Sequence, residues 1–214
     1  MSLRDYLASN FVDKAKFSAL AGITEKRLDD LIRIEAIPAA TYVCDGTTIS
    51  SAAFGTMAIS EQLSGEYFRP ECLRWVQIAN QAGPGNEKAT VESVLASELQ
   101  AAFIQLELVA PDEQLSFKTR IDEYLPSFFN GTFGLCVADP SSGIGIARKE
   151  ILQEILGALT ENGANPEPAA ISAADLITLI DDYAAAAMPF SPAEYGRSSR
   201  KRLVDDLRPR VTKA

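Results

Sequence analysis

FSALAGITEKRLDDLIRIEAIPAATYVCDG, residues 17–46, has the spacing of two short helices joined by a sharp turn and followed by a β-hairpin. Gly22 stands where a helix that ends in left-handed geometry favours glycine. Thr24 is a good N-cap for the helix that follows. Asp45-Gly46 lies between two short β-prone runs, which is a strong signal for a hairpin turn.

The apolar positions of this stretch give the limits of the expected elements. Helices are predicted over residues 13–21 and 24–35, with the turn at Gly22 and a hairpin that turns at Asp45-Gly46. The apolar residues that recur at helical spacing, and are therefore expected in the core, are Phe17, Leu20, Ala21, Leu28, Leu31 and Ile32.

The order of these signals resembles the winged helix-turn-helix of the MerR-like regulators. The matching positions are Leu20-Ala21-Gly22-Ile23-Thr24, Leu28, Arg33, Ile34, Ile37, Pro38 and Asp45-Gly46. The resemblance implies a second helix that reads nucleic acid, beside a hairpin wing. The candidate nucleic-acid-binding residues are then Thr24, Lys26, Arg27 and Arg33.

The charges of this segment depart from the family pattern. Acidic Asp29 and Asp30 lie on the second helix, Glu35 replaces the glycine that closes it, and the wing residues 47–49 are uncharged. Contacts to phosphate supply most of the affinity for DNA, and they need cations. We therefore expect weak nucleic-acid binding at best, and the alternative is a helix-turn-helix that serves only for packing.

Composition excludes several classes of chemistry. The 214 residues include no histidine, which removes His-dependent catalysis and His-ligated metals. The three cysteines, Cys44, Cys72 and Cys136, are too widely spaced for a CxxC motif or a disulfide framework, and we expect them to be buried and free. Any enzyme would have to rely on carboxylates, lysine, tyrosine or serine; we expect no catalytic residue, no metal site, no cofactor and no enzymatic activity.

Charge is distributed unevenly along the chain. Residues 1–40 are neutral overall, residues 41–196 carry a net charge of −14, and residues 197–214 carry +5. The acidic body repels anionic membranes and DNA. Neither a signal peptide nor a run of apolar residues long enough to span a membrane is apparent. The expected location is the cytoplasm, with no membrane partner.

The remainder of the chain has helical spacing. Gly83-Pro84-Gly85 separates helices, a long helix is expected from Asn86 to Val109, and Pro126 is expected to end the next one. Ser142 and Ser172 are N-cap candidates for two more helices. The predicted fold is mainly α, with a winged helix-turn-helix-like unit over residues 1–60 packed on an α-helical bundle over residues 61–214.

A basic segment near the C-terminus offers a candidate anion site. Arg197, Ser198, Ser199 and Arg200 combine hydroxyl groups, free amides at a helix start and cations, which together attract an anion. The alternative is an ordinary N-cap with arginines that pair with the acidic body. The surrounding pattern PFSPAEYGRSSRKRLV, residues 189–204, resembles the C-terminal end of an uncharacterised bacterial family with a helix-turn-helix-like N-terminus, which implies no activity.

The sequence thus indicates a bacterial regulatory or binding module with a degenerate helix-turn-helix. Its partners would be a protein or weakly bound DNA. Two other functions stay open: a protein–protein interaction or scaffolding module, and a small-anion-binding protein centred on the C-terminal basic segment. The oligomeric state is left open.

Overall fold

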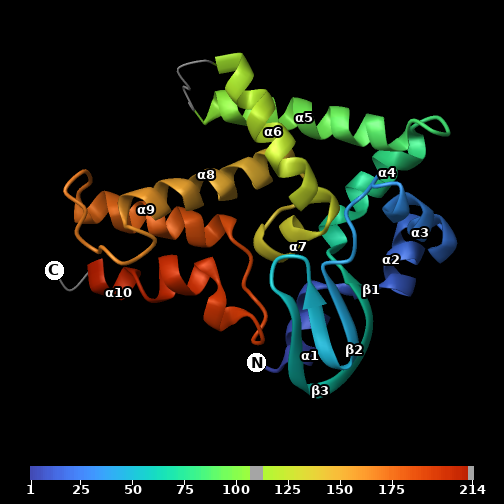
Figure 1. The fold of residues 1–214 in the computed structure, drawn as a ribbon, viewed down its shortest axis with the longest axis horizontal. Helices are drawn as coiled ribbons and strands as arrows, with labels where there is room; N and C mark the ends of the chain where they lie inside the picture. Colours follow the sequence, from blue (N-terminus) through green and yellow to red (C-terminus); the bar gives the residue numbers. More distant parts are fainter. Residues whose placement is uncertain (107–112, 212–214) are drawn as a thin grey trace.

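The computed structural model describes residues 1–106 and 113–211. Over these residues the protein is mainly helical and carries one three-stranded antiparallel sheet. Figure 1 shows the sheet and the first helices on one side of the molecule and the C-terminal helices on the other, with the long helix α5 along the top. The predicted mainly α fold is confirmed.

The N-terminal elements form a small unit around the sheet. They are α1 (Leu3–Asn10), β1 (Val12–Asp13), α2 (Lys14–Ala21), α3 (Glu25–Arg33), β2 (Tyr42–Ser51) and β3 (Gly55–Phe68).

The rest of the chain is helical. A 3₁₀ turn, Pro70–Cys72, leads into α4 (Leu73–Gln81), α5 (Glu87–Gln105), α6 (Glu113–Phe129), α7 (Thr132–Cys136), α8 (Gly143–Leu159) and α9 (Ala173–Ala186). A 3₁₀ turn at Tyr195–Arg197, a π-helical turn at Lys201–Asp205 and α10 (Arg208–Val211) follow.

The two predicted N-terminal helices and the turn between them are present. Gly22 ends α2 with a φ of 69°, in the left-handed region. The Thr24 side chain caps α3 by accepting a hydrogen bond from the Arg27 amide, 3.1 Å away. Leu28 of α3 is buried as expected. Leu20 of α2 is 53% exposed, so fewer apolar residues of α2 are buried than their helical spacing predicted.

The hairpin is present, but the prediction that it turns at Asp45-Gly46 is wrong. The strands pair from Tyr42 with Tyr67 to Ser51 with Gly55, so the turn comes after Ser51. Gly46, with a φ of 64°, instead lies where the pairing shifts by a bulge. Cys44 and Ile49 are both buried although their odd spacing would place them on opposite faces of a regular strand, and the bulge corrects this.

The later helices agree with the prediction except at the end of α6. Ser142 and Ser172 cap α8 and α9 through their side chains. Pro126 does not end α6, which continues to Phe129 because Phe128 and Phe129 pack into the core, with Phe128 edge-on to Trp75 at 4.9 Å. The expected end of α5 at Val109 lies outside the described residues.

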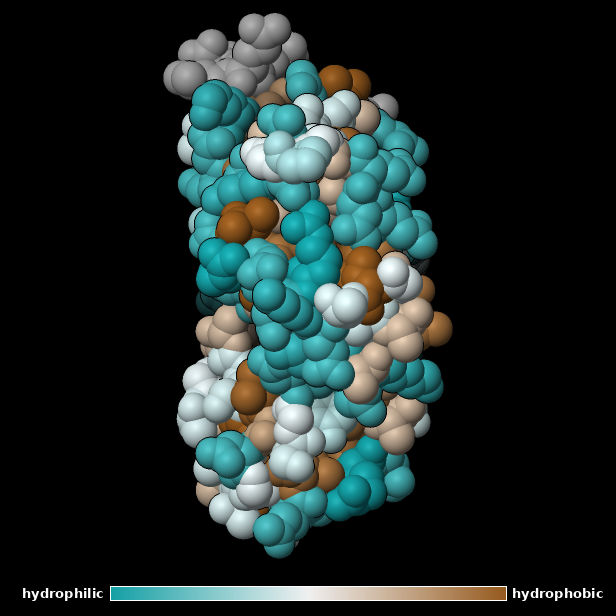
Figure 2. Space-filling model, turned by 90° about the vertical axis from the view of Figure 1, so that its right-hand side faces the viewer, coloured by the Kyte–Doolittle hydropathy of each residue, from teal (hydrophilic) through white to brown (hydrophobic). Residues whose placement is uncertain are grey.

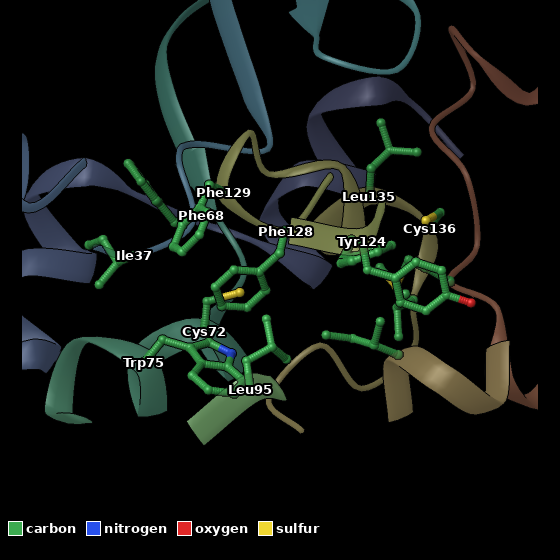
Figure 3. Packing of buried hydrophobic residues seen from close by; sticks show 14 of the residues in the cluster. Ile37, Phe68, Cys72, Trp75, Leu95, Tyr124, Phe128, Phe129, Leu135 and Cys136 are labelled. Carbon is green, nitrogen blue, oxygen red and sulfur yellow. The ribbon is translucent and has the colours of Figure 1, made fainter. Parts of the chain in front are cut away.

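One hydrophobic core runs from the first helix to Phe190, and part of it is shown in Figure 3. A second, smaller cluster joins α8, α9 and the C-terminal turns; its buried members include Leu156, Ile180, Leu203 and Leu207. The division expected after residue 60 falls within β3, whose residues Leu63 and Phe68 belong to the larger core.

Buried Arg69 joins three segments that are far apart in the sequence. Its guanidinium donates to the Ala138 carbonyl oxygen at 2.9 Å and to the Met188 sulfur at 2.7 Å. It also pairs with Glu71 at 2.8 Å. A buried guanidinium needs such partners to offset its loss of hydration, so these contacts fix residues 136–138 and 188 against the end of β3.

Glu194 makes a second buried polar connection between the ends of the chain. Its carboxyl group is fully buried and accepts hydrogen bonds from the hydroxyls of Tyr42 at 2.6 Å, Ser51 at 2.7 Å and Ser191 at 2.9 Å. Burial, together with the neighbouring Tyr6 and Glu194, raises the pKa of Tyr42 far above its ordinary value. The Tyr42 hydroxyl therefore stays a donor over the whole working pH range.

Replacing Glu194 tests how much this connection contributes to stability. Glu194→Ala leaves three buried hydroxyls without an acceptor, at about 1 kcal/mol or more each. We expect the free energy of unfolding, measured by urea denaturation, to fall by roughly 3 kcal/mol or more. Glu194→Gln keeps an acceptor oxygen and should lose less than half of that amount. Equal losses for the two variants would contradict the role of the hydroxyl contacts.

Glu35 provides a test of backbone geometry at the end of α3. It has a φ of 52°, in the region that favours glycine, and it pairs with Lys88 at 2.6 Å. We expect Glu35→Gly to be more stable than Glu35→Ala by about 1 kcal/mol, because both lose the ion pair but only glycine relieves the strain. At exposed Lys26, inside α3, the order of the matched glycine and alanine variants should reverse. The same order at both positions would contradict the assignment.

Candidate functional site

The four candidate nucleic-acid-binding residues lie at the start and along the surface of α3, but most of their polar groups are engaged within the chain. Thr24 caps the helix. Arg27 pairs with Glu87 at 2.8 Å, and Arg33 pairs with Asp30 at 2.6 Å. Lys26 is exposed and is in none of the ion pairs found among the described residues.

Further ion pairs balance the charge around α3, and one of them involves Lys88 at the start of α5. Lys14 contacts Asp29 at 2.5 Å and Glu66 at 2.8 Å, while Lys88 of α5 contacts Glu35. Figure 2 views the side of the molecule on which α3 and the α4–α5 connection lie, and it is mostly hydrophilic with small, separate hydrophobic patches. Helix α3 thus presents ion-paired groups of both signs rather than a basic face.

The four candidate anion-binding residues divide into two pairs. The Ser198 hydroxyl donates to the Tyr195 carbonyl and accepts from the Lys201 amide at 3.0 Å. The Arg200 guanidinium donates to the carbonyl oxygens of Ala184 and Ala187. Arg197 and Ser199, in contrast, line a pocket together with Arg202. Neither Arg197 nor Arg200 pairs with an acid among the described residues; the ion pairs of the described tail are Lys201–Asp206 and Arg208–Asp181.

We call this cavity the tail pocket. It has a volume of about 430 Å³, within the usual range for small-molecule sites. Its walls come from the turn between β2 and β3, from α6, α7 and α8, and from the C-terminal segment. The lining residues are Ala53, Phe54, Glu123, Tyr124, Ser127, Thr132, Phe133, Leu135, Cys136, Lys149, Glu150, Gln153, Phe190, Arg197, Ser199 and Arg202.

Arg197 connects the C-terminal segment to the turn between β2 and β3 at the edge of the tail pocket. Its guanidinium donates to the Phe54 carbonyl oxygen at 3.1 Å and to the Met57 sulfur at 2.9 Å. It also lies 5.0 Å from the centre of the Phe54 ring, as in a cation–π contact. The side chain is exposed, so part of the guanidinium still faces solvent.

Lys149 is the buried cation of the tail pocket. It is 3% exposed, and its amine lies 2.7 Å from a carboxylate oxygen of Glu150. Burial alone would lower the pKa of Lys149, but the acidic groups of Cys136, Glu150 and Tyr183 outweigh it and raise that pKa. Lys149 is therefore charged at neutral pH and neutralised by Glu150, which leaves it unsuited to act as a nucleophilic amine.

Tyr124 lines the tail pocket, and its hydroxyl lies buried beneath the pocket surface. Its oxygen is buried and has no hydrogen-bond partner in the described part of the chain. Its ring packs edge-on against Phe133, with centroids 5.8 Å apart, and Figure 3 shows it near Cys136. Burial raises the pKa of Tyr124, so the hydroxyl remains protonated. An unpaired buried hydroxyl costs free energy.

Sequence reasoning found only part of this pocket. Arg197 and Ser199 came from the basic segment, but Tyr124, Lys149 and Gln153 were not expected there. One signal was available for Lys149: it shares a face of α8 with buried Ile146 and Leu156, where a lysine is unusual. Tyr124 has no comparable signal, because its missing partner appears only in three dimensions.

Metal and membrane sites were also sought in the part of the chain that the structure describes. It holds no group of three or more Cys, Asp or Glu side chains placed to bind a metal ion. None of its helices combines the length and apolar character needed to cross a membrane.

Comparison with known proteins gives one match. Residues 88–212, more than half of the chain, match the model of a Family of unknown function (DUF6058), and the chain belongs to this family. The match includes the C-terminal pattern for which a resemblance to an uncharacterised family was expected, and most of the tail pocket. It leaves out residues 17–46, so it gives no support to the MerR-like resemblance. Curated proteins give no match, and solved structures give none either.

The buried thiols provide a test of the packing of the core, and one of them, Cys136, also lines the tail pocket. Cys44, Cys72 and Cys136 are all buried and free, and burial raises the pKa of Cys44 to about 11 and that of Cys72 to about 12. Because the thiolate is the reactive form, we expect all three to react with Ellman's reagent at pH 8 far more slowly than a free thiol. In guanidinium chloride all three should react at once. A fast-reacting thiol in the native protein would contradict the burial.

Proposed function

We propose that this protein is a small-anion-binding module, with the tail pocket as its binding site. The observation that carries the proposal is that Arg197 and Arg202 reach the same pocket as Ser199 and Tyr124, and that neither arginine is in an ion pair among the described residues. A guanidinium near hydroxyl groups at the edge of an open, partly apolar pocket is suited to a carboxylate or phosphate. The protein binds its ligand and carries out no reaction on it.

A regulatory role for the N-terminal unit is a second candidate. The succession of α2, a turn at Gly22, α3 and a hairpin supports this proposal, because it is the succession that the MerR-like resemblance implies. The ion pairs of α3 argue against strong contacts with phosphates, and the turn of the wing is held by Arg197. In this proposal the unit binds nucleic acid weakly or serves as a protein-binding surface.

The anion site can be tested with phosphate at matched ionic strength. A ligand that binds only the folded state raises its stability by mass action. At ten times its dissociation constant, phosphate should raise the melting temperature by about 3–5 °C relative to chloride. The effect should vanish in the double variant Arg197→Gln/Arg202→Gln.

Arg148→Gln is the matched control, since Arg148 lies on α8 beside Lys149 in the sequence but outside the tail pocket. It removes one positive charge by the same kind of substitution and should keep the full phosphate response. An equal phosphate response in the wild type, the double variant and the control would overturn the anion site, because salting-out by phosphate needs no specific residue.

Nucleic-acid binding is tested separately by fluorescence anisotropy with duplex DNA. We expect a dissociation constant above about 1 µM at physiological salt, because few cations of α3 are available for phosphate contacts. Lys26→Ala should weaken the binding and Asp29→Asn should strengthen it. Nanomolar binding at physiological salt that is lost in Lys26→Ala/Arg27→Ala would overturn the view that α3 serves mainly for packing.

A further inference from the structure

We infer that the ligand of the tail pocket is an acidic amino acid, a small molecule with two carboxylates and one ammonium group. This inference rests on the proposed anion site and names the chemical class that the site recognises. Three features of the pocket carry it: charged groups of both signs that are in no ion pair, the net charge of the lining, and a polar wall positioned by Tyr183.

Three charged residues of the tail pocket are in no ion pair among the described residues. Arg197 and Arg202 belong to the C-terminal segment, whereas Glu123 lies on α6, and all three residues are exposed. Among the lining residues, all of which the structure describes, Lys149 and Glu150 form the one ion pair. The two arginines and Glu123 therefore line the same pocket without neutralising each other by direct contact.

Opposite charges that share a pocket without touching suit a ligand that carries the complementary charges. A ligand carboxylate accepts hydrogen bonds from a guanidinium, and a ligand ammonium donates to the carboxylate of Glu123. The two guanidiniums and one carboxylate of the protein then correspond to two carboxylates and one ammonium on the ligand. The pocket volume of about 430 Å³ leaves room for a small molecule of this kind.

The net charge of the lining fits the same class of ligand. Arg197, Arg202 and Glu123 together leave one positive charge, because Lys149 and Glu150 neutralise each other. An acidic amino acid carries one net negative charge at neutral pH, so its complex balances the pocket. A dicarboxylate without the ammonium would bring a second net negative charge to a pocket that already contains the carboxylate of Glu123.

A polar wall supplies further donors to a ligand carboxylate. The hydroxyl of Tyr183, a fully buried residue of α9, lies 3.1 Å from the Oε1 of Gln153 and 2.8 Å from the Oγ of Ser199. Because this contact engages the side-chain oxygen of Gln153, the amide N–H groups of that side chain remain available to a ligand. Gln153 and Ser199 both line the tail pocket, so a carboxylate in it finds neutral donors as well as guanidiniums.

The test compares four probes by NMR titration of the isotopically labelled protein at neutral pH and matched ionic strength: L-glutamate, glutarate, 4-aminobutyrate and inorganic phosphate. Glutarate lacks the ammonium of L-glutamate, and 4-aminobutyrate lacks one of its carboxylates. Because a contact between exposed charges is weak, we expect L-glutamate to bind about 2- to 5-fold more tightly than either of them. Phosphate should also bind more weakly than L-glutamate, since it has no cation for Glu123.

Glu123→Gln tests the contact with the ammonium group. It leaves both arginines in place, so glutarate should bind at least as tightly as to the wild type, and the preference for L-glutamate over glutarate should vanish. Glu167→Gln is the matched control, since Glu167 is exposed and lies outside the tail pocket. This control should keep the preference.

The arginines are tested with the same probes. Arg197→Gln/Arg202→Gln should lose L-glutamate, glutarate and phosphate, whereas Arg148→Gln, outside the tail pocket, should keep them.

The outcomes separate the inference from the proposed function. Glutarate or phosphate that binds at least as tightly as L-glutamate, and depends on Arg197 and Arg202, would overturn the inference and leave the anion site standing. A preference for L-glutamate over glutarate that persists in Glu123→Gln, or equal binding of 4-aminobutyrate and L-glutamate, would also overturn the inference alone. The absence of any anion binding that depends on these arginines would overturn both.

Discussion

The carboxyl group of Glu194 accepts hydrogen bonds from Tyr42 and Ser51 of β2 and from Ser191, and the rest of the structure depends on this buried contact. The three hydrogen bonds must form together, because each unpaired hydroxyl or carboxyl oxygen in the core would cost free energy. The C-terminal segment must therefore lie along the hairpin in one register. Arg197 follows Glu194 by less than one turn, and this register carries it to Phe54 at the mouth of the tail pocket.

The N-terminal unit and the family-matched half of the chain form one packed body. The match to the family model begins at residue 88, yet Glu87 and Lys88 pair with Arg27 and Glu35 at the two ends of α3. The larger core also crosses this point, from the first helix to Phe190. These contacts occupy charged groups and apolar surface of the N-terminal unit. A separate DNA-binding domain would present such groups to DNA, so residues that pack within the chain are not available for DNA contacts.

In the tail pocket, the buried cation Lys149 is paired with Glu150, whereas Arg197 and Arg202 are exposed at the edge. A buried lysine is tolerated because Glu150 offsets the loss of hydration, and the pair contributes no net charge. In the proposed anion site, recognition would depend on the arginines nearer to solvent, whose planar guanidiniums suit a carboxylate. The aromatic residues of the lining, Phe54, Phe133 and Phe190, distinguish this pocket from a surface cluster of cations.

The sequence by itself determined the features that depend on neighbours in the chain. The cap at Thr24, the left-handed Gly22 and the capping serines of α8 and α9 are local, because each satisfies backbone groups within a few residues. Tertiary structure decided the rest. Pairing along the whole hairpin moved the turn past Ser51 and made Gly46 a bulge, since Cys44 and Ile49 both had to reach the core. The tail pocket joins residues from Ala53 to Arg202, and no local pattern could reveal that Tyr124, Lys149 and Arg197 share one space, because only the folded chain brings them together.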